Sequence, residues 1–247
     1  MAYDIAFWML ALDNPDYPVA QLGNLSVELS DKLRALAIIT LLVKGESDFF
    51  FHNLIRSGRA REIYLLRARA AGLVEDYHYV LGRPLPLLDL IAAGDLERAR
   101  RIGAASPAHF RQGREYEDDH WYAAVLLALL AEPSVPAAVD QALDAWERSL
   151  DGLDLSRVHV VRAIAAGSKE DFAPSFEALL DRRDVEIREE KQRNKIENAT
   201  TLASRDVFVE GLALLRLAER AGIATSPEYR YCPGLARLPM QQPFPGE

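Results

Sequence analysis

The sequence predicts an all-α protein built from helical hairpins that stack side by side. Apolar residues recur at helical spacing along nearly all of the 247 residues, and the alternating pattern of strands is almost absent. Helical segments also end repeatedly in Ala-Gly, as at Ala93-Gly94 and Ala166-Gly167. Glycine is the residue that best tolerates the left-handed conformation after a helix. We therefore expect one helical domain over residues 1–247.

The individual helices follow from the apolar spacing and from the residues that begin and end them. Asp95 follows Gly94 directly and Ser168 follows Gly167, and both are good N-terminal caps. Such immediate restarts predict tight αα-hairpins. In chain order, the predicted helices lie near residues 2–12, 26–43, 47–57, 59–71, 84–93, 95–104, 116–131, 136–151, 155–166, 169–195 and 199–221.

Two architectures fit these hairpins. Helix ends near Gly94, Ala131 and Gly167 have the spacing of two-helix solenoid repeats, but the side-chain pattern between them does not repeat. A solenoid-like stack and an irregular helical bundle both stay open. The tail, residues 222–247, contains five prolines and is predicted to be irregular and packed on the helices.

The charge is concentrated in one part of the chain. Residues 115–154 contain ten acidic residues and one basic residue, Arg148, while the whole chain has a formal net charge of −8. The rest of the chain is thus nearly neutral. A charge surplus held in one segment indicates a surface that meets a cationic partner, although a merely solvated face is the competing interpretation.

Two adjacent stripes run along the predicted helix 136–151. The apolar stripe faces the core, and the acidic stripe lies one position further round the helix. Like charges four residues apart destabilise a helix by roughly 0.2–0.5 kcal/mol per pair, so solubility alone does not favour this arrangement. The apolar stripe is Val139, Leu143, Trp146 and Leu150, and the acidic stripe is Asp140, Asp144, Glu147 and Asp151.

Composition excludes several classes of function. An isoelectric point near 5.3 disfavours nucleic-acid binding and attachment to an anionic membrane, because both need clustered Lys and Arg. No apolar run has the length of a membrane span. Cys232 is the single cysteine, which rules out a disulfide within the chain and fits a cytoplasmic protein.

Signals for catalysis or metal binding are weak. Two Glu-x-x-His units, Glu75 to His78 and Glu117 to His120, would suit a di-iron bundle if Glu28, Glu46 or Glu62 completed it. The first unit lies between two glycines and the second at a helix start, so we expect no metal and no cofactor. Nucleophile-elbow, phosphate-loop and dinucleotide motifs do not occur, and we expect no enzyme.

Two stretches resemble a known family. They are residues 115–123, EYEDDHWYA, and residues 207–222, VFVEGLALLRLAERAG. Both resemble the immunity protein 49 family, mostly helical antidotes encoded beside toxins in bacterial polymorphic toxin systems. The likeness covers roughly residues 110–235. It implies binding and neutralisation of a cognate toxin without catalysis, and many toxins of these systems are nucleases with basic active surfaces.

We therefore expect an immunity protein that covers the basic active surface of a toxin in the cytoplasm. The alternative is a helical-repeat scaffold or regulator whose partner is not a toxin. The sequence leaves the oligomeric state open. The residues expected to bind the partner are Glu115, Glu117, Asp118, Asp119, Asp140, Asp144, Glu147 and Asp151.

Overall fold

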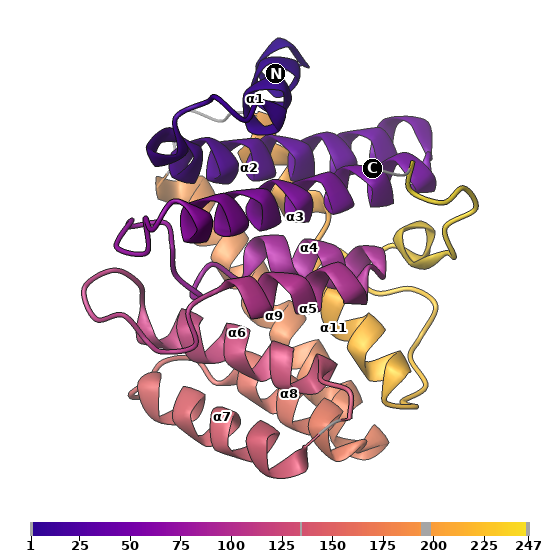
Figure 1. Ribbon diagram of the computed structural model, residues 1–247. Helices are drawn as coiled ribbons and strands as arrows, with labels where there is room; N and C mark the ends of the chain where they lie inside the picture. The colour runs from indigo at the N-terminus through magenta and orange to yellow at the C-terminus, as the bar shows by residue number, and fades with distance from the viewer. Residues whose placement is uncertain (1, 134, 194–198, 246–247) are drawn as a thin grey trace.

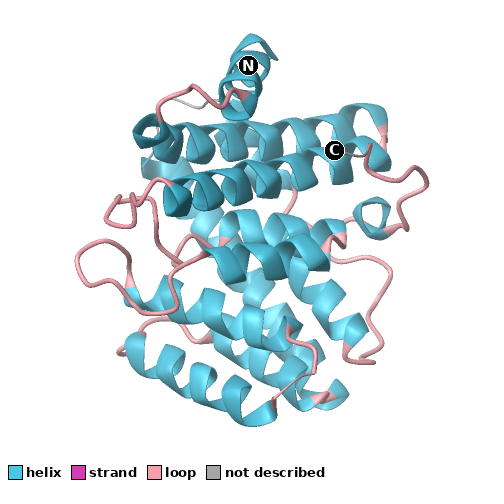
Figure 2. Ribbon diagram, in the orientation of Figure 1, coloured by secondary structure: helices cyan, strands magenta, loops and turns pink. Residues whose placement is uncertain are grey.

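The computed structural model describes residues 2–133, 135–193 and 199–245. Helices joined by loops make up nearly all of this part of the chain, and no strand occurs among the described residues (Figure 2). The all-α prediction is confirmed. Within the same residues, no helix has both the length and the apolar character needed to cross a membrane. The helices are α1 (Ala2–Asp13), α2 (Val19–Lys44), α3 (Ser47–Ala70), α4 (Leu85–Ala93), α5 (Leu96–Ala105), α6 (Glu117–Leu130), α7 (Pro136–Ser149), α8 (Ser156–Ala166), α9 (Lys169–Arg193), α10 (Ala199–Asp206), α11 (Val209–Arg220) and the short 3₁₀ helix η1 (Gly234–Arg237).

Consecutive helices pair as hairpins, and the first three of the pairs named next lie one below another in Figure 1. The pairs are α2 with α3, α4 with α5, α6 with α7, and α8 with α9. Gly94 and Gly167 end α4 and α8 with φ of 83° and 63°, in the left-handed region where glycine is favoured. The predicted tight turns are therefore present.

The last helices make the stack an irregular bundle. Helix α9 has 25 residues and runs behind the stack in Figure 1. The chain then returns, so that α10 packs against α2 and α11 packs against α4. In a regular solenoid each repeat contacts only its neighbours. Of the two architectures that the sequence left open, the structure has the irregular one.

Helix α3 is continuous where two helices, 47–57 and 59–71, were predicted. The two predicted ranges leave out Gly58, and glycine weakens a helix interior. In the structure Gly58 is the point where Leu90 of α4 approaches the α3 backbone. A Cβ atom added to Gly58 would lie 2.2 Å from Leu90 Cγ. The glycine therefore serves close packing of α3 against α4.

Gly58→Ala tests this contact. We expect a net loss of up to about 2 kcal/mol in the free energy of unfolding, because an overpacking cost of roughly 1–3 kcal/mol is partly offset by a gain of roughly 1 kcal/mol in helix propensity. Urea unfolding of Gly58→Ala, Leu90→Ala and the double variant measures it. In the double variant Leu90 is shortened, so its loss should be smaller than the sum of the single losses. Additive losses would show that the two residues are not in contact.

Other boundaries also differ from the prediction. Helix α2 begins at Val19, seven residues before the predicted start, and Gly23 inside it passes close to the His78 side chain. The predicted helix 199–221 is divided into α10 and α11, because the Phe208 amide donates a hydrogen bond to Tyr231 O at 2.7 Å instead of continuing the helix. The predicted end of α9 at residue 195 lies outside the described residues.

The described part of the tail contacts α3. The backbone amides of Gln241 and Gln242 donate to the carboxylate of Asp48, at 2.7 and 3.0 Å. The ring of Phe244 lies edge-on to His52, with the centroids 5.6 Å apart. These contacts attach the irregular C-terminal segment to the N-terminal third of the chain.

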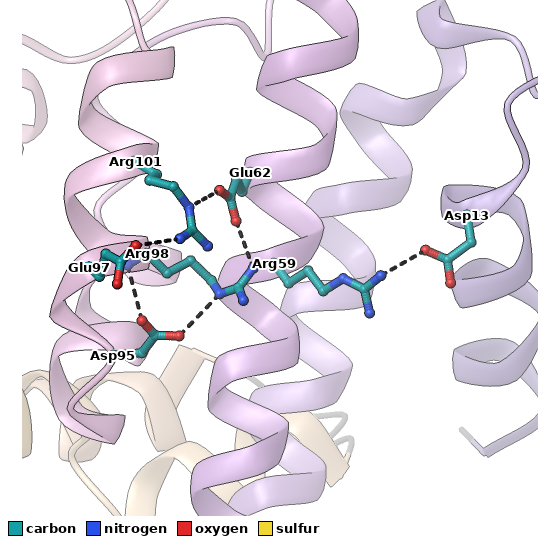
Figure 3. Close-up of polar contacts among 7 residues, drawn as sticks. All are labelled: Asp13, Arg59, Glu62, Asp95, Glu97, Arg98 and Arg101. Atoms are coloured by element: carbon teal, nitrogen blue, oxygen red, sulfur yellow. Dashed lines mark hydrogen bonds and ion pairs between the residues drawn. The ribbon is translucent and has the colours of Figure 1, made fainter. Parts of the chain in front are cut away.

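A cluster of ion pairs joins α3 to α5 (Figure 3). Glu62 of α3 accepts hydrogen bonds from Arg98 Nη1 at 2.8 Å and from Arg101 Nε at 2.6 Å, and its side chain is 8% exposed. Arg98 also donates to Asp95, the residue that caps α5. Both oxygens of Glu62 are thus bound to guanidinium groups.

Candidate partner-binding surface

The acidic stripe of α7 lies on the surface. Asp140, Asp144 and Glu147 are exposed, while Val139, Leu143 and Trp146 of the same helix are buried. The helix ends at Ser149, so Asp151 lies in the following turn, exposed and with a φ of 39°. The predicted helix 136–151 is therefore two residues too long, but its division into an apolar and an acidic face is present.

One arginine partly balances this stripe. Arg162 of α8 places Nη2 2.6 Å from Glu147 and 3.7 Å from Asp144. All three side chains are more than two-fifths exposed, and such pairs contribute about 0–1 kcal/mol, so a partner can displace them readily. Asp140 and Asp151 make no ion pair among the described residues. The α7 stripe thus keeps a net negative charge.

The acids at the start of α6 divide between the surface and the interior. Helix α6 begins and α7 ends on the same side of Figure 1. Glu117 is exposed, and Asp118 and Asp119 are half-buried. These three residues occupy the first turn of α6, where the helix dipole favours negative charge. Glu117 thus joins the exposed acids of the α6–α7 hairpin.

Glu115 differs from its expected role at the surface. Its side chain is 0% exposed and accepts hydrogen bonds from the amides of Gly82 and Arg111, at 2.5 and 2.9 Å. Burial alone would raise its pKa, but contact with His120, 3.3 Å away, and the two amide hydrogen bonds lower the pKa instead. Glu115 therefore fastens the loop before α6 to the segment before α4.

The two Glu-x-x-His units do not form a metal site here. His120 contacts Glu115, and Glu75 pairs with Arg111 and Arg114, at 2.8 and 3.0 Å. Within the residues that the structure describes, no group of three or more His, Cys, Asp or Glu side chains is arranged to hold a metal ion.

A cavity of about 340 Å³ opens beside the start of α6. On one wall, Tyr122 of α6 donates a hydrogen bond to Glu210 Oε1 of α11 at 2.8 Å, and Arg157 Nε of α8 forms an ion pair with the same oxygen at 2.8 Å. Tyr122 also stacks on Trp146 of α7, with ring centroids 4.6 Å apart. This cluster links the α6–α7 hairpin to α8 and α11. The charged residues that line the cavity are Asp31, Arg34, Arg61, Arg83, Asp119, Arg157 and Glu210.

Only Asp119 of this lining was predicted as a functional residue. The others come from five further segments of the chain, and no motif connects them. Their convergence depends on the return of α11 to α4, which the local sequence pattern does not encode.

Asp119 has a perturbed carboxyl group. Burial, followed by the negative charge of Asp118, raises its pKa from 3.8 to about 6, while Arg157 opposes the shift and Glu210 and Glu115 add to it. The folded protein holds the Asp119 proton more tightly than the unfolded chain does. The contribution of this proton to the free energy of unfolding is therefore complete below about pH 4. It is lost as the pH rises through about 6.

Asp119→Asn removes this ionisation. We expect the variant to be more stable than the original chain by about 1 kcal/mol at pH 7.5, a value reduced for the partial exposure of the group. The difference should shrink as the pH falls to 4.5. Urea unfolding at both pH values measures it, with Glu117→Gln as the control on the exposed side of the same turn. An Asp119→Asn difference that does not depend on pH would contradict the shifted pKa.

Comparison with known proteins agrees with the resemblance in the sequence. The family model for immunity protein 49 matches residues 82–235, from the segment before α4 to η1. No curated protein and no solved structure gives a match. The matched region contains α6, α7 and the whole cluster of Tyr122, Arg157 and Glu210. Because this region is well over half of the chain, the protein belongs to the immunity protein 49 family.

Proposed function

We propose that the protein binds a cognate bacterial toxin in the cytoplasm and neutralises it by covering a basic active surface. The observation that carries the proposal is the exposed row Asp140, Asp144 and Glu147 on α7, which belongs to the region that matches the family. Carboxylates spaced along one helix can form charge-assisted hydrogen bonds with Lys and Arg of a partner. The protein acts by binding, without catalysis of its own.

Charge also explains how such a protein finds its toxin quickly. A field of one sign speeds encounter with a partner of the opposite sign and disfavours neutral competitors. We propose Glu117, Asp118, Asp140, Asp144, Glu147 and Asp151 as the residues of this surface. Asp119 takes part only at its rim, because it lines the cavity.

Co-expression with the product of the neighbouring gene, which the proposal expects to be the toxin, tests the proposed function. We expect a stable complex of the two purified proteins and loss of the toxin's activity when this chain is in molar excess. The toxin's own assay, such as nucleic-acid cleavage for a nuclease, measures neutralisation. No complex and unchanged toxin activity would refute the proposal and favour a scaffold with a different partner.

A further inference from the structure

The cavity beside α6 contains two arginines, Arg61 and Arg83, that form no ion pair with a carboxylate among the described residues. Arg61 of α3 is 3% exposed and donates to the backbone oxygens of His78 at 2.7 Å and Val80 at 2.5 Å. Arg83 makes no ion pair among the described residues, and its Nε is buried without a hydrogen-bond partner. Both line the cavity.

The other two arginines of the lining are already paired. Arg34 binds Asp89 through two hydrogen bonds of 2.7 Å, and Arg157 is paired with Glu210. The charge left over on this side of the cavity therefore belongs to Arg61 and Arg83.

The positive charges of Arg61 and Arg83 repel each other. Burial lowers the pKa of Arg61 to about 10, and the positive charge of Arg83 contributes to that shift, while Tyr64, Glu115 and Asp76 oppose it. Asp76 is occupied, because Oδ1 accepts from Tyr64 Oη at 2.6 Å and from the His78 amide at 2.8 Å. A buried positive charge without an ion-pair partner is unfavourable, and an anion bound in the cavity would supply that partner.

We propose that this cavity binds a small organic anion whose carboxylate or phosphate group lies against Arg61 and Arg83. Arginine suits both groups, because its planar fork can donate two parallel hydrogen bonds. The backbone oxygens of His78 and Val80 hold the Arg61 guanidinium in place before the ligand arrives.

The remaining walls define the rest of the ligand. Val27, Leu85, Pro86 and Leu88 give an apolar side, and a volume of about 340 Å³ lies at the lower end of small-molecule sites, which span roughly 300–1,000 Å³. Asp119 lies on the wall formed by α6 and repels a second negative group, whereas Glu210 of α11 is already paired with Arg157. The ligand therefore carries a single anionic group and hydrogen-bond donors, such as hydroxyls, at its other end.

Calorimetric titration of the purified chain with inorganic phosphate, glycerol phosphate and lactate tests the site. Chloride keeps the ionic strength constant in each titration. We expect saturable binding of at least one of the three probes with a dissociation constant in the millimolar range or below. No saturable heat from any probe would overturn the proposal. Since no toxin is present, this outcome is independent of the proposed function.

Matched variants locate the bound anion. Arg83→Gln removes an arginine that makes no ion pair, so we expect an unchanged fold by circular dichroism and at least tenfold weaker binding. Arg83→Lys keeps the charge and should bind within about threefold of the original chain. Arg188→Gln is the control, because Arg188 is exposed on α9 and, within the part of the chain that the structure describes, donates only to its own helix. Equal binding by Arg83→Gln and the original chain would also overturn the proposal.

Discussion

Charge reversal of Asp140, Asp144 and Glu147 to lysine should slow association with the toxin by about 10- to 100-fold at low salt. The substitutions make the α7 stripe repel a basic partner, while Glu117, Asp118 and Asp151 keep part of the attraction of the proposed surface. The dependence of the association rate on salt should also become weaker, because screening then has less attraction to remove. Stopped-flow or surface-plasmon-resonance kinetics at several salt concentrations measure both effects.

The control for this experiment is a second triple variant with the same total change in charge at a different place on the surface. Three exposed acids serve here: Asp16 between α1 and α2, Glu28 on α2, and Glu46 just before α3. None of them makes an ion pair among the described residues. Their joint change to lysine should alter the association rate by less than about threefold, because α2 and α3 lie at the opposite end of the molecule from α7 in Figure 1. An equal effect of the two triple variants would mean that only net charge matters.

Asp89→Ala should destabilise the fold by about 3–5 kcal/mol, because it leaves a buried arginine without its main partner. The Asp89 side chain is 0% exposed. It accepts two hydrogen bonds of 2.7 Å from Arg34 of α2 and one of 2.5 Å from Ser57 of α3. This group therefore joins α2 and α3 to α4. Urea unfolding followed by circular dichroism measures the loss.

Two further variants test whether the unpaired charge of Arg34 causes the loss of stability in Asp89→Ala. Asp31 also pairs with Arg34, at 3.0 Å, but its side chain is 45% exposed, so Asp31→Ala should cost less than about 1 kcal/mol. The double variant Arg34→Met with Asp89→Leu replaces the pair by apolar groups and should recover most of the stability lost in Asp89→Ala. A double variant as unstable as Asp89→Ala would show that removal of the unpaired charge does not restore the fold.

Features that depend on local periodicity could be predicted from the sequence. The apolar and acidic stripes of α7 repeat with the period of the helix, and both appear on the expected sides. Gly94 and Gly167 end helices because the left-handed conformation is a property of the residue itself. The family resemblance also rests on contiguous stretches of sequence.

Features that depend on distant contacts could not be predicted. Gly58 resembles a helix break until Leu90 is known to pack against it. Glu115 resembles one more surface acid, but it is buried and accepts a hydrogen bond from Gly82, 33 residues away. The cavity combines residues from α2, α3, α6, α8 and α11. The periodicity of the sequence predicts on which face of a helix an acidic residue lies, whereas the tertiary packing decides whether that residue remains accessible to solvent.

Hydrogen exchange of the chain with and without its toxin tests the central claim most directly. If the α6–α7 hairpin receives the toxin, peptides from residues 117–121 and 136–151 should exchange more slowly in the complex. The exchange rates of peptides from α2 and α3 should be unchanged. Slower exchange elsewhere in the chain, with none in residues 136–151, would contradict the assignment of this surface.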